Sequence, residues 1–240
     1  MGAGGVSEAA EQSPTLDDLK IEITQTLEFF EKIEWHKEAF VDLVIVGFSL
    51  TIIEQIHSIH ILCEQKKFLD AKILLRSSLE HFLEILLLSN NDNKKYIERI
   101  KLEFNHHQVK SLNAAQSGNQ YAAGILEKID IKVNLQELEK YKNEIEMRGG
   151  KTVNRRDRFI SAGYGDMYDT IYSALSKLAH PTFAGIVERH FVVDHQTNDF
   201  TVHAFRIIET ETIIVIVGTA VNLLQSTRII LNEKFPQKRH

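Results

Sequence analysis

A row of four polar side chains in the C-terminal half of the chain has the residue types for acid–base chemistry. Asp169, Ser173, Ser176 and His180 are spaced four, three and four residues apart, so they share one face of a helix that turns by about 100° per residue. Imidazole titrates near neutral pH and can donate or accept a proton. Because Pro181 would end the helix, His180 would be presented at its C-terminus, where the protonated ring is favoured. The same row also fits a solvated helix face.

A second candidate is an ion pair on an earlier apolar helix. Arg76 and Glu80 are four residues apart and would be neighbours on one edge of that helix. In a structural role, the pair would fix the helix against its partner. In a functional role, Arg76 would bind an anionic ligand while Glu80 orients the guanidinium, which is always charged and matches phosphate oxygens. Both interpretations remain open.

Taken together, these positions resemble a known pattern, Arg-x-x-x-Glu followed much later by Tyr-x-x-x-Tyr-x-x-x-Ser-x-x-x-His-Pro. It is similar to a widespread uncharacterised helical bacterial family, which in turn resembles the HEPN superfamily (higher eukaryotes and prokaryotes nucleotide-binding domains). The matching residues are Arg76, Glu80, Tyr168, Tyr172, Ser176, His180 and Pro181. The resemblance spans roughly residues 45–181. It implies a helical bundle, often dimeric, and metal-independent endoribonuclease activity in toxin and antiviral defence systems.

The resemblance also implies roles for individual residues. The catalytic set would be Arg76, Glu80, Ser176 and His180, supported by Tyr168, Asp169, Tyr172 and Ser173. A ribose 2′-OH would attack the adjacent phosphate, with His180 managing the proton and Arg76 stabilising the charge on the phosphate oxygens.

One departure from the HEPN pattern bears on activity. Active HEPN nucleases carry an Arg separated by four to six residues from the His, and the corresponding positions here are Ser173, Ala174 and Leu175. Arg76 and His81 have that spacing, but on a different helix and about 140° apart around it. Either Arg76 replaces the missing Arg in space, or the protein has no nuclease activity.

A cluster of basic residues surrounds the Gly149-Gly150 break. Its members are Arg148, Lys151, Arg155, Arg156 and Arg158, and only Asp157 opposes them. Such a cluster could bind a nucleic-acid backbone without sequence preference. It could equally be a solvated basic loop.

Two Glu-x-x-His pairs raise a rival interpretation. Glu54 with His57, and Glu103 with His106, follow the order of ligands in di-iron four-helix bundles. Glu103 and His106, however, point largely away from the apolar stripe of their own helix, whereas a bundle metal site needs inward ligands. We therefore expect no metal and no cofactor.

The elements that must position these residues are mostly helices. With 12 Gly and 3 Pro in 240 residues, the chain favours an all-α bundle of long antiparallel helices. We expect a flexible leader over residues 1–14 and one helical domain over 15–240. The predicted helices cover about 15–33, 37–65, 67–88, 92–115, 134–147, 164–180 and 209–233, with a small β-hairpin at about 186–205. The helix at 37–65 is apolar almost all round, which predicts a central helix covered on several sides.

Composition limits the class of protein. At 43% hydrophobic and 25% charged residues, the chain can build a core. A net charge of −5 argues against a surface that binds nucleic acid everywhere. The single Cys63 fits a buried thiol in a reducing cytoplasm. No signal peptide or uncharged span of about 20 residues is evident, so we expect a soluble, cytoplasmic protein without a membrane partner.

Two function classes remain open at this level. The first is a HEPN-like protein that binds or cleaves RNA, as a homodimer or with a partner protein of a defence system. The second is a non-catalytic helical module that regulates a partner.

Overall fold

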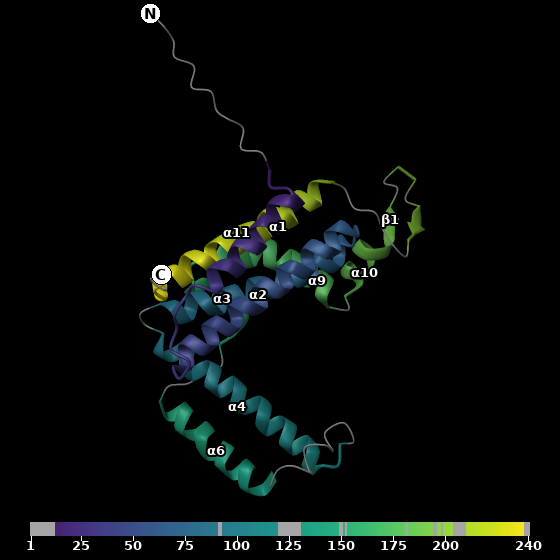
Figure 1. The fold of residues 1–240 in the computed structure, drawn as a ribbon. Coiled ribbons are helices and arrows are strands. Elements are labelled where there is room, and N and C mark those ends of the chain that lie inside the picture. Colours follow the sequence, from purple (N-terminus) through teal and green to yellow (C-terminus); the bar gives the residue numbers. More distant parts are fainter. Residues whose placement is uncertain are drawn as a thin grey trace, which may run out of the picture. The chain divides into compact units, whose positions relative to one another are not determined.

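The computed structural model describes residues 13–90, 93–119, 131–148, 151, 153–180, 182–193, 196–197, 199–203 and 210–237. Helices account for most of them (Figure 1), which confirms the all-α prediction. The elements are α1 (Leu16–Phe30), α2 (Phe40–Glu64), α3 (Phe68–Ser89), α4 (Lys94–Gln116), α6 (Ile131–Met147), α7 (Arg155–Ser161), α8 (Gly165–Met167), a π-helical turn (Tyr168–Tyr172), α9 (Ser173–Ala179), α10 (Phe183–His190), β1 (Phe191–Val193), β2 (Phe200–Val202) and α11 (Thr210–Lys234). Most of the expected leader lies outside the described residues.

The start of α1 illustrates how local sequence sets a helix boundary. The Thr15 hydroxyl accepts a hydrogen bond from the Asp18 amide at 3.2 Å, and the Asp18 carboxylate accepts one from the Thr15 amide at 2.8 Å. This capping box satisfies amides that have no partner within the helix. Acidic side chains in the first turn also interact favourably with the helix dipole.

The chain divides into two compact units. Unit 1 contains residues up to Phe82 and from Met167 onward, and unit 2 contains Leu83–Asp166. In unit 1, α1, α2 and α11 pack on one another around fully buried side chains such as Leu19, Ile52 and Val217. In unit 2, α4 packs against α6, with Leu112 and Ala115 buried against Leu135 and Leu138.

The helix at 164–180 differs from the sequence expectation in its middle. Residues Tyr168–Tyr172 form a π-helical turn between α8 and α9, and a π turn holds one residue more than an α turn. A helical wheel with a constant 100° per residue therefore assigns residues after this turn to the wrong face of the helix. Tyr172, Leu175 and Leu178 are buried, whereas Ile171 is 39% exposed. The predicted end is confirmed, because α9 stops at Ala179 and His180 has extended backbone.

The hairpin is shorter than expected. Its strands pair antiparallel with Phe191 opposite Val202 and Val193 opposite Phe200. Residues 183–190, of which the period-two pattern assigned 186–190 to a strand, instead form α10, whose N-cap is Thr182: its hydroxyl accepts a hydrogen bond from the Gly185 amide at 3.0 Å. A side-chain cap and packing of α10 on α9 outweigh the alternation over these few residues.

Helix α2 is less covered than its composition predicts. Ile45, Ile52 and Ile56 are fully buried, but Leu43 and Leu50 remain 51% and 41% exposed. By length and composition α2 and residues Thr212–Lys234 of α11 could each cross a membrane, a property that core helices of soluble proteins share. The cytoplasmic localisation therefore stays a prediction.

A close approach between α9 and α10 gives a test of this packing. A Cβ at Gly185 would lie 2.5 Å from the Lys177 carbonyl oxygen, which is backbone and cannot move aside cheaply. We expect Gly185→Ala to lower the free energy of unfolding by roughly 1–3 kcal/mol, measured by urea denaturation.

The matched control is Gly218→Ala in α11, where a Cβ would meet no atom within 4 Å. There the substitution should stabilise by about 0.5–1 kcal/mol, because Ala favours a helix interior over Gly. Equal effects at the two positions would contradict the packing of α9 on α10.

Candidate functional site

The centre of the candidate site is a contact among Arg76, Glu80 and Tyr172. The Arg76 Nη2 donates to the Tyr172 hydroxyl at 2.8 Å, and that hydroxyl donates to Glu80 Oε1 at 2.6 Å. Arg76 Nη2 also lies 2.9 Å from Glu80 Oε1, which closes the set. Tyr172 is almost fully buried, and the Arg76 side chain is only 12% exposed. We call these three residues with Tyr168 the Arg76 cluster.

Local structure explains why these side chains meet. Arg76 and Glu80 stand one turn apart on α3, as their spacing predicts. The π-helical turn brings Tyr172 to the buried face, with its ring 5.1 Å from the Arg76 guanidinium carbon. Tyr168 stacks on Tyr172, with ring centroids 5.1 Å apart and planes inclined by 17°. Aromatic stacking and the cation–π contact both favour this arrangement.

Neighbouring polar contacts fix α3 around the cluster. The Gln55 amide of α2 donates to the Ser77 hydroxyl at 3.0 Å and accepts from the buried Ser78 hydroxyl at 3.0 Å. Near the start of α3, Lys72 pairs with Glu188 at 3.2 Å. Sequence reasoning missed Gln55 and Glu188, because no spacing rule connects residues on different helices.

The structure places the other predicted residues of this site on α9 and its flanks. Ser173 and Ser176 are partly buried, whereas Asp169 and His180 are exposed. The structure thus joins Arg76, Glu80, Tyr168 and Tyr172 by direct contacts. The participation of Ser176 and His180 in the same site stays a prediction.

Two members of the predicted basic cluster are engaged with acids of unit 2. Arg148 Nη2 lies 3.0 Å from Glu98 Oε2, and Arg158 contacts Glu84 at 2.8 Å and Glu103 at 2.9 Å. Lys151, Arg155 and Arg156 are exposed.

Arg158 belongs to a closed ring of two arginines and two glutamates. Arg99 is 1% exposed and contacts Glu84 and, at 2.8 Å, Glu103. Each glutamate therefore bridges Arg99 and Arg158, and the ring ties together α3, α4 and α7. Buried ions are tolerated when their charges are paired and their hydrogen bonds are made. This ring gives Arg158 a structural role that the run of basic residues did not reveal.

The four residues of the rival di-metal hypothesis are either paired with arginines or exposed to solvent. Glu103 is occupied by the two arginines of the ring, and Glu54, His57 and His106 are exposed. Within the described parts of the chain, no group of three or more His, Cys, Asp or Glu side chains is arranged to hold a metal ion. Cys63 is buried, which raises the pKa of its thiol to about 11 and keeps it protonated at neutral pH.

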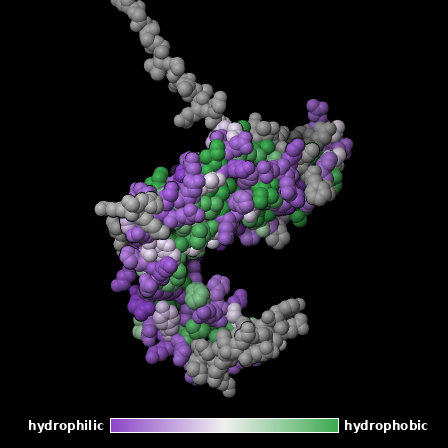
Figure 2. Space-filling view, viewed as in Figure 1, coloured by the Kyte–Doolittle hydropathy of each residue, from purple (hydrophilic) through white to green (hydrophobic). Residues whose placement is uncertain are grey.

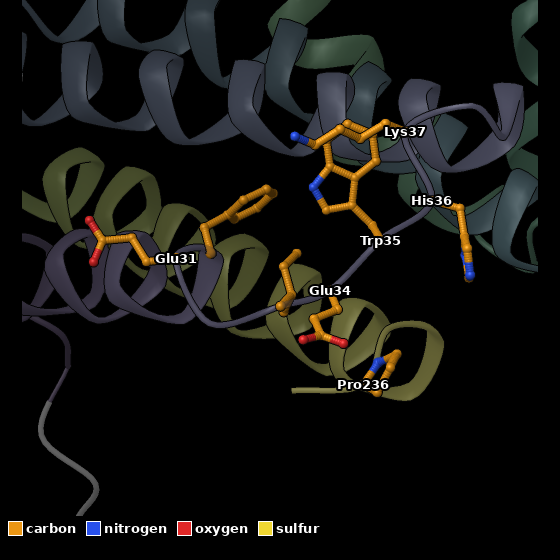
Figure 3. A pocket seen from close by; sticks show the side chains of 8 residues that line it. Glu31, Glu34, Trp35, His36, Lys37 and Pro236 are labelled. Carbon is orange, nitrogen blue, oxygen red and sulfur yellow. The ribbon is translucent and has the colours of Figure 1, made fainter. Parts of the chain in front are cut away.

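Two pockets lie in unit 1, away from the predicted residues of the Arg76 cluster. The larger, about 600 Å³, is formed by the segment after α1 and by Pro236. Figure 3 shows the Trp35 ring beside the Lys37 side chain, with Glu34 on the side of Pro236. The Glu34 amide donates to the Pro236 carbonyl at 2.9 Å, which ties this segment to the end of α11. The smaller pocket, about 340 Å³, lies between α1 and α2 beside Glu54 and His57.

The first test concerns the Tyr172 hydroxyl. Tyr172→Phe keeps the ring but leaves Arg76 and Glu80 without their shared partner. We expect the free energy of unfolding to fall by about 1–3 kcal/mol, measured by urea denaturation. Tyr141→Phe, at a 38% exposed position of α6, is the control and should change stability by less than about 0.5 kcal/mol. Equal free energies of unfolding for the two variants would mean that the contacts of the Tyr172 hydroxyl do not stabilise the fold.

The second test uses the acid sensitivity of Glu98. Burial alone would raise the pKa of this carboxyl, but hydrogen bonds and charges from Lys101 and Arg148 together outweigh it and hold the pKa below its usual value. The ionised carboxylate therefore stabilises the fold above the pKa of the unfolded state, about 4.3, and this contribution is lost as the pH falls through the lower folded pKa.

We expect Glu98→Gln to be less stable than wild type at pH 7 and to differ less from it at pH 3. Urea midpoints measured from pH 7 to pH 3 would show the two curves converging. A gap of constant size would contradict the ion-pair explanation.

Comparison with known proteins identifies a family but no activity. A model of a family of unknown function (DUF5677) matches residues 42–199. No curated protein and no solved structure matches the chain. The matched segment includes the Arg76 cluster, Ser176 and His180. Because it spans more than half of the 240 residues, the chain belongs to this family of unknown function.

Proposed function

We propose that this protein is a HEPN-like, RNA-binding protein of a bacterial toxin or antiviral defence system, with the Arg76 cluster and His180 forming its RNA site. The observation that carries the proposal is the contact of Arg76 and Glu80 with Tyr172, 96 and 92 residues later in the chain. The resemblance to HEPN proteins rests on these same residues. Their assembly in one place is what a shared site requires.

The chemistry of the cluster suits a nucleic-acid ligand. Tyr168 is partly exposed and belongs to an aromatic stack, and bases stack on aromatic rings with little sequence preference. Arg76 would contact a phosphate through guanidinium N–H groups that its contacts with Tyr172 and Glu80 leave available. In unit 2, Lys151, Arg155 and Arg156 would by themselves attract an RNA backbone without sequence preference.

Cleavage requires more of the site than binding does. The charge of Arg76 is balanced by Glu80 at 2.9 Å, so a phosphate must compete with that carboxylate. In the catalytic form of the proposal, His180 transfers the proton and Arg76 stabilises the developing charge without a metal or cofactor. In the binding form, the same residues hold RNA without cutting it.

The decisive experiment is RNA cleavage measured in EDTA. For the catalytic form we expect the wild type to cut single-stranded RNA and His180→Ala to reduce the rate by at least about 100-fold. His106→Ala, at an exposed position on α4, is the matched control and should retain full activity. No cleavage by wild type across varied RNAs would exclude the catalytic form.

The binding form has its own readout. Replacing Lys151, Arg155 and Arg156 together by Ala should weaken RNA binding and make it less dependent on salt. The slope of log affinity against log salt concentration should fall by about 0.7 for each phosphate that the variant no longer neutralises. Filter binding at several salt concentrations measures both effects. Absence of salt-dependent RNA binding by the wild type would overturn the proposal as a whole.

One observation favours the second function class, a non-catalytic interaction module. Phe183 and Ile186 of α10 are 80% and 46% exposed, and Val202 of β2 is 65% exposed. Exposed apolar side chains in neighbouring elements are typical of partner surfaces. A protein partner bound there is compatible with a site at the Arg76 cluster.

A further inference from the structure

The exposed side of α2 has the spacing of a helix–helix interface. Its exposed residues recur at alternating intervals of four and three, which is the a/d spacing of coiled coils. Seven of them make up this row, Leu43, Gly47, Leu50, Glu54, His57, Ile61 and Glu64, while the exposed Phe40 and Ser58 are not part of it. We call this row the α2 strip. Figure 2 shows hydrophobic side chains among polar ones on the face of unit 1 where Figure 1 places α2.

The α2 strip is open to a partner along its length. Leu43, Leu50 and Ile61 are 51%, 41% and 40% exposed, and a Cβ at Gly47 would meet no atom within 4 Å. From Leu43 to Glu64 the strip is about 30 Å long. The pocket between α1 and α2 borders Glu54 and His57, and the 46% exposed Leu27 on its α1 side extends the apolar surface.

The order of polar residues along the α2 strip indicates which kind of partner fits it. Glu54 and His57 lie at its centre, and among the described residues neither side chain has a hydrogen-bond or ion-pair partner. If a second copy of α2 runs antiparallel and Glu54 of one copy faces His57 of the other, two-fold symmetry forms the same pair twice. In that register Leu50 faces Ile61 of the other copy, and Gly47 faces Glu64.

The other occupants fit the charges less well. A parallel pair would place Glu54 against Glu54, where like charges repel. A membrane would have to accept the carboxylates of Glu54 and Glu64 in its hydrocarbon region, which is costly. We propose that this chain forms an antiparallel homodimer through the α2 strip, with reciprocal Glu54–His57 contacts at its centre.

Cysteine cross-linking tests the register directly. Leu50→Cys combined with Ile61→Cys should give a covalent dimer on mild oxidation, because each introduced thiol faces one on the other copy. Leu50→Cys alone should not, because the two copies of position 50 would lie eleven residues apart, about 16 Å along the helix, whereas a disulfide requires Cα atoms within about 7 Å. The native Cys63 is buried and stays in both variants.

Solution mass tests the interface without cross-linking. The wild type should sediment as a dimer, and Leu50→Glu should weaken self-association by at least about tenfold, because it buries an unpaired carboxylate. Ile229→Glu on α11, at a 59% exposed position, is the matched control and should remain dimeric. Circular dichroism of both variants checks that the helices are intact.

A charge exchange tests the central pair. His57→Glu alone should dissociate the dimer, since carboxylates would face each other at both symmetric contacts. Adding Glu54→His should restore it, because the exchanged pair is again complementary. A monomeric wild type, cross-linking by Leu50→Cys alone, failure of the double exchange to restore the dimer, or co-sedimentation of the wild type with lipid vesicles would each overturn the proposal.

Discussion

The hydroxyl of Tyr172 is the contact on which the candidate site depends. It accepts a hydrogen bond from Arg76 and donates one to Glu80, so it joins α3 to the segment that leads to His180. Arg76 and Glu80 are partly buried, and removing such charges from water is costly unless their hydrogen bonds are made. Tyr172 supplies two of these hydrogen bonds. The π-helical turn directs Tyr172 inward, and such turns often occur at functional sites.

Charge is organised differently in the two units. In unit 1 the Arg76 cluster combines one ion pair with aromatic rings, one of which, Tyr168, reaches solvent. In unit 2 the ring of Arg99, Arg158, Glu84 and Glu103 satisfies its charges internally. The first arrangement leaves donor groups for a ligand, whereas the second is suited to holding helices together. This contrast is why we base the proposed RNA site on Arg76 and not on Arg158.

The exposed side of α2 also has a physical explanation. A helix as apolar as α2 would ordinarily be covered on all sides, yet its Leu43–Glu64 strip faces solvent. The alternating spacing and the central Glu54 and His57 offer a specific means of covering it with a second copy. The proposed interface and the proposed RNA site use different residues, so each can be tested without the other.

The sequence by itself determined the helical class, most helix boundaries and the pairing of Arg76 with Glu80. These features depend on local periodicity, capping residues and i, i+4 spacing, which a single stretch of chain contains. It also predicted correctly that the helix at 164–180 ends just before Pro181. The hairpin was recognised but placed too early, because alternation over a few residues cannot be distinguished from a short capped helix such as α10.

Only the tertiary structure decided which of these residues come together and which are covered. The contact of Tyr172 with α3, the role of Gln55, the ring that engages Arg158 and the open side of α2 all depend on packing between segments distant in sequence. No periodicity encodes such contacts, since they arise from the shapes and charges of elements folded against one another. The π-helical turn was likewise not predictable from the sequence pattern. Its extra residue changes which helix face the residues of the row from Asp169 to His180 occupy.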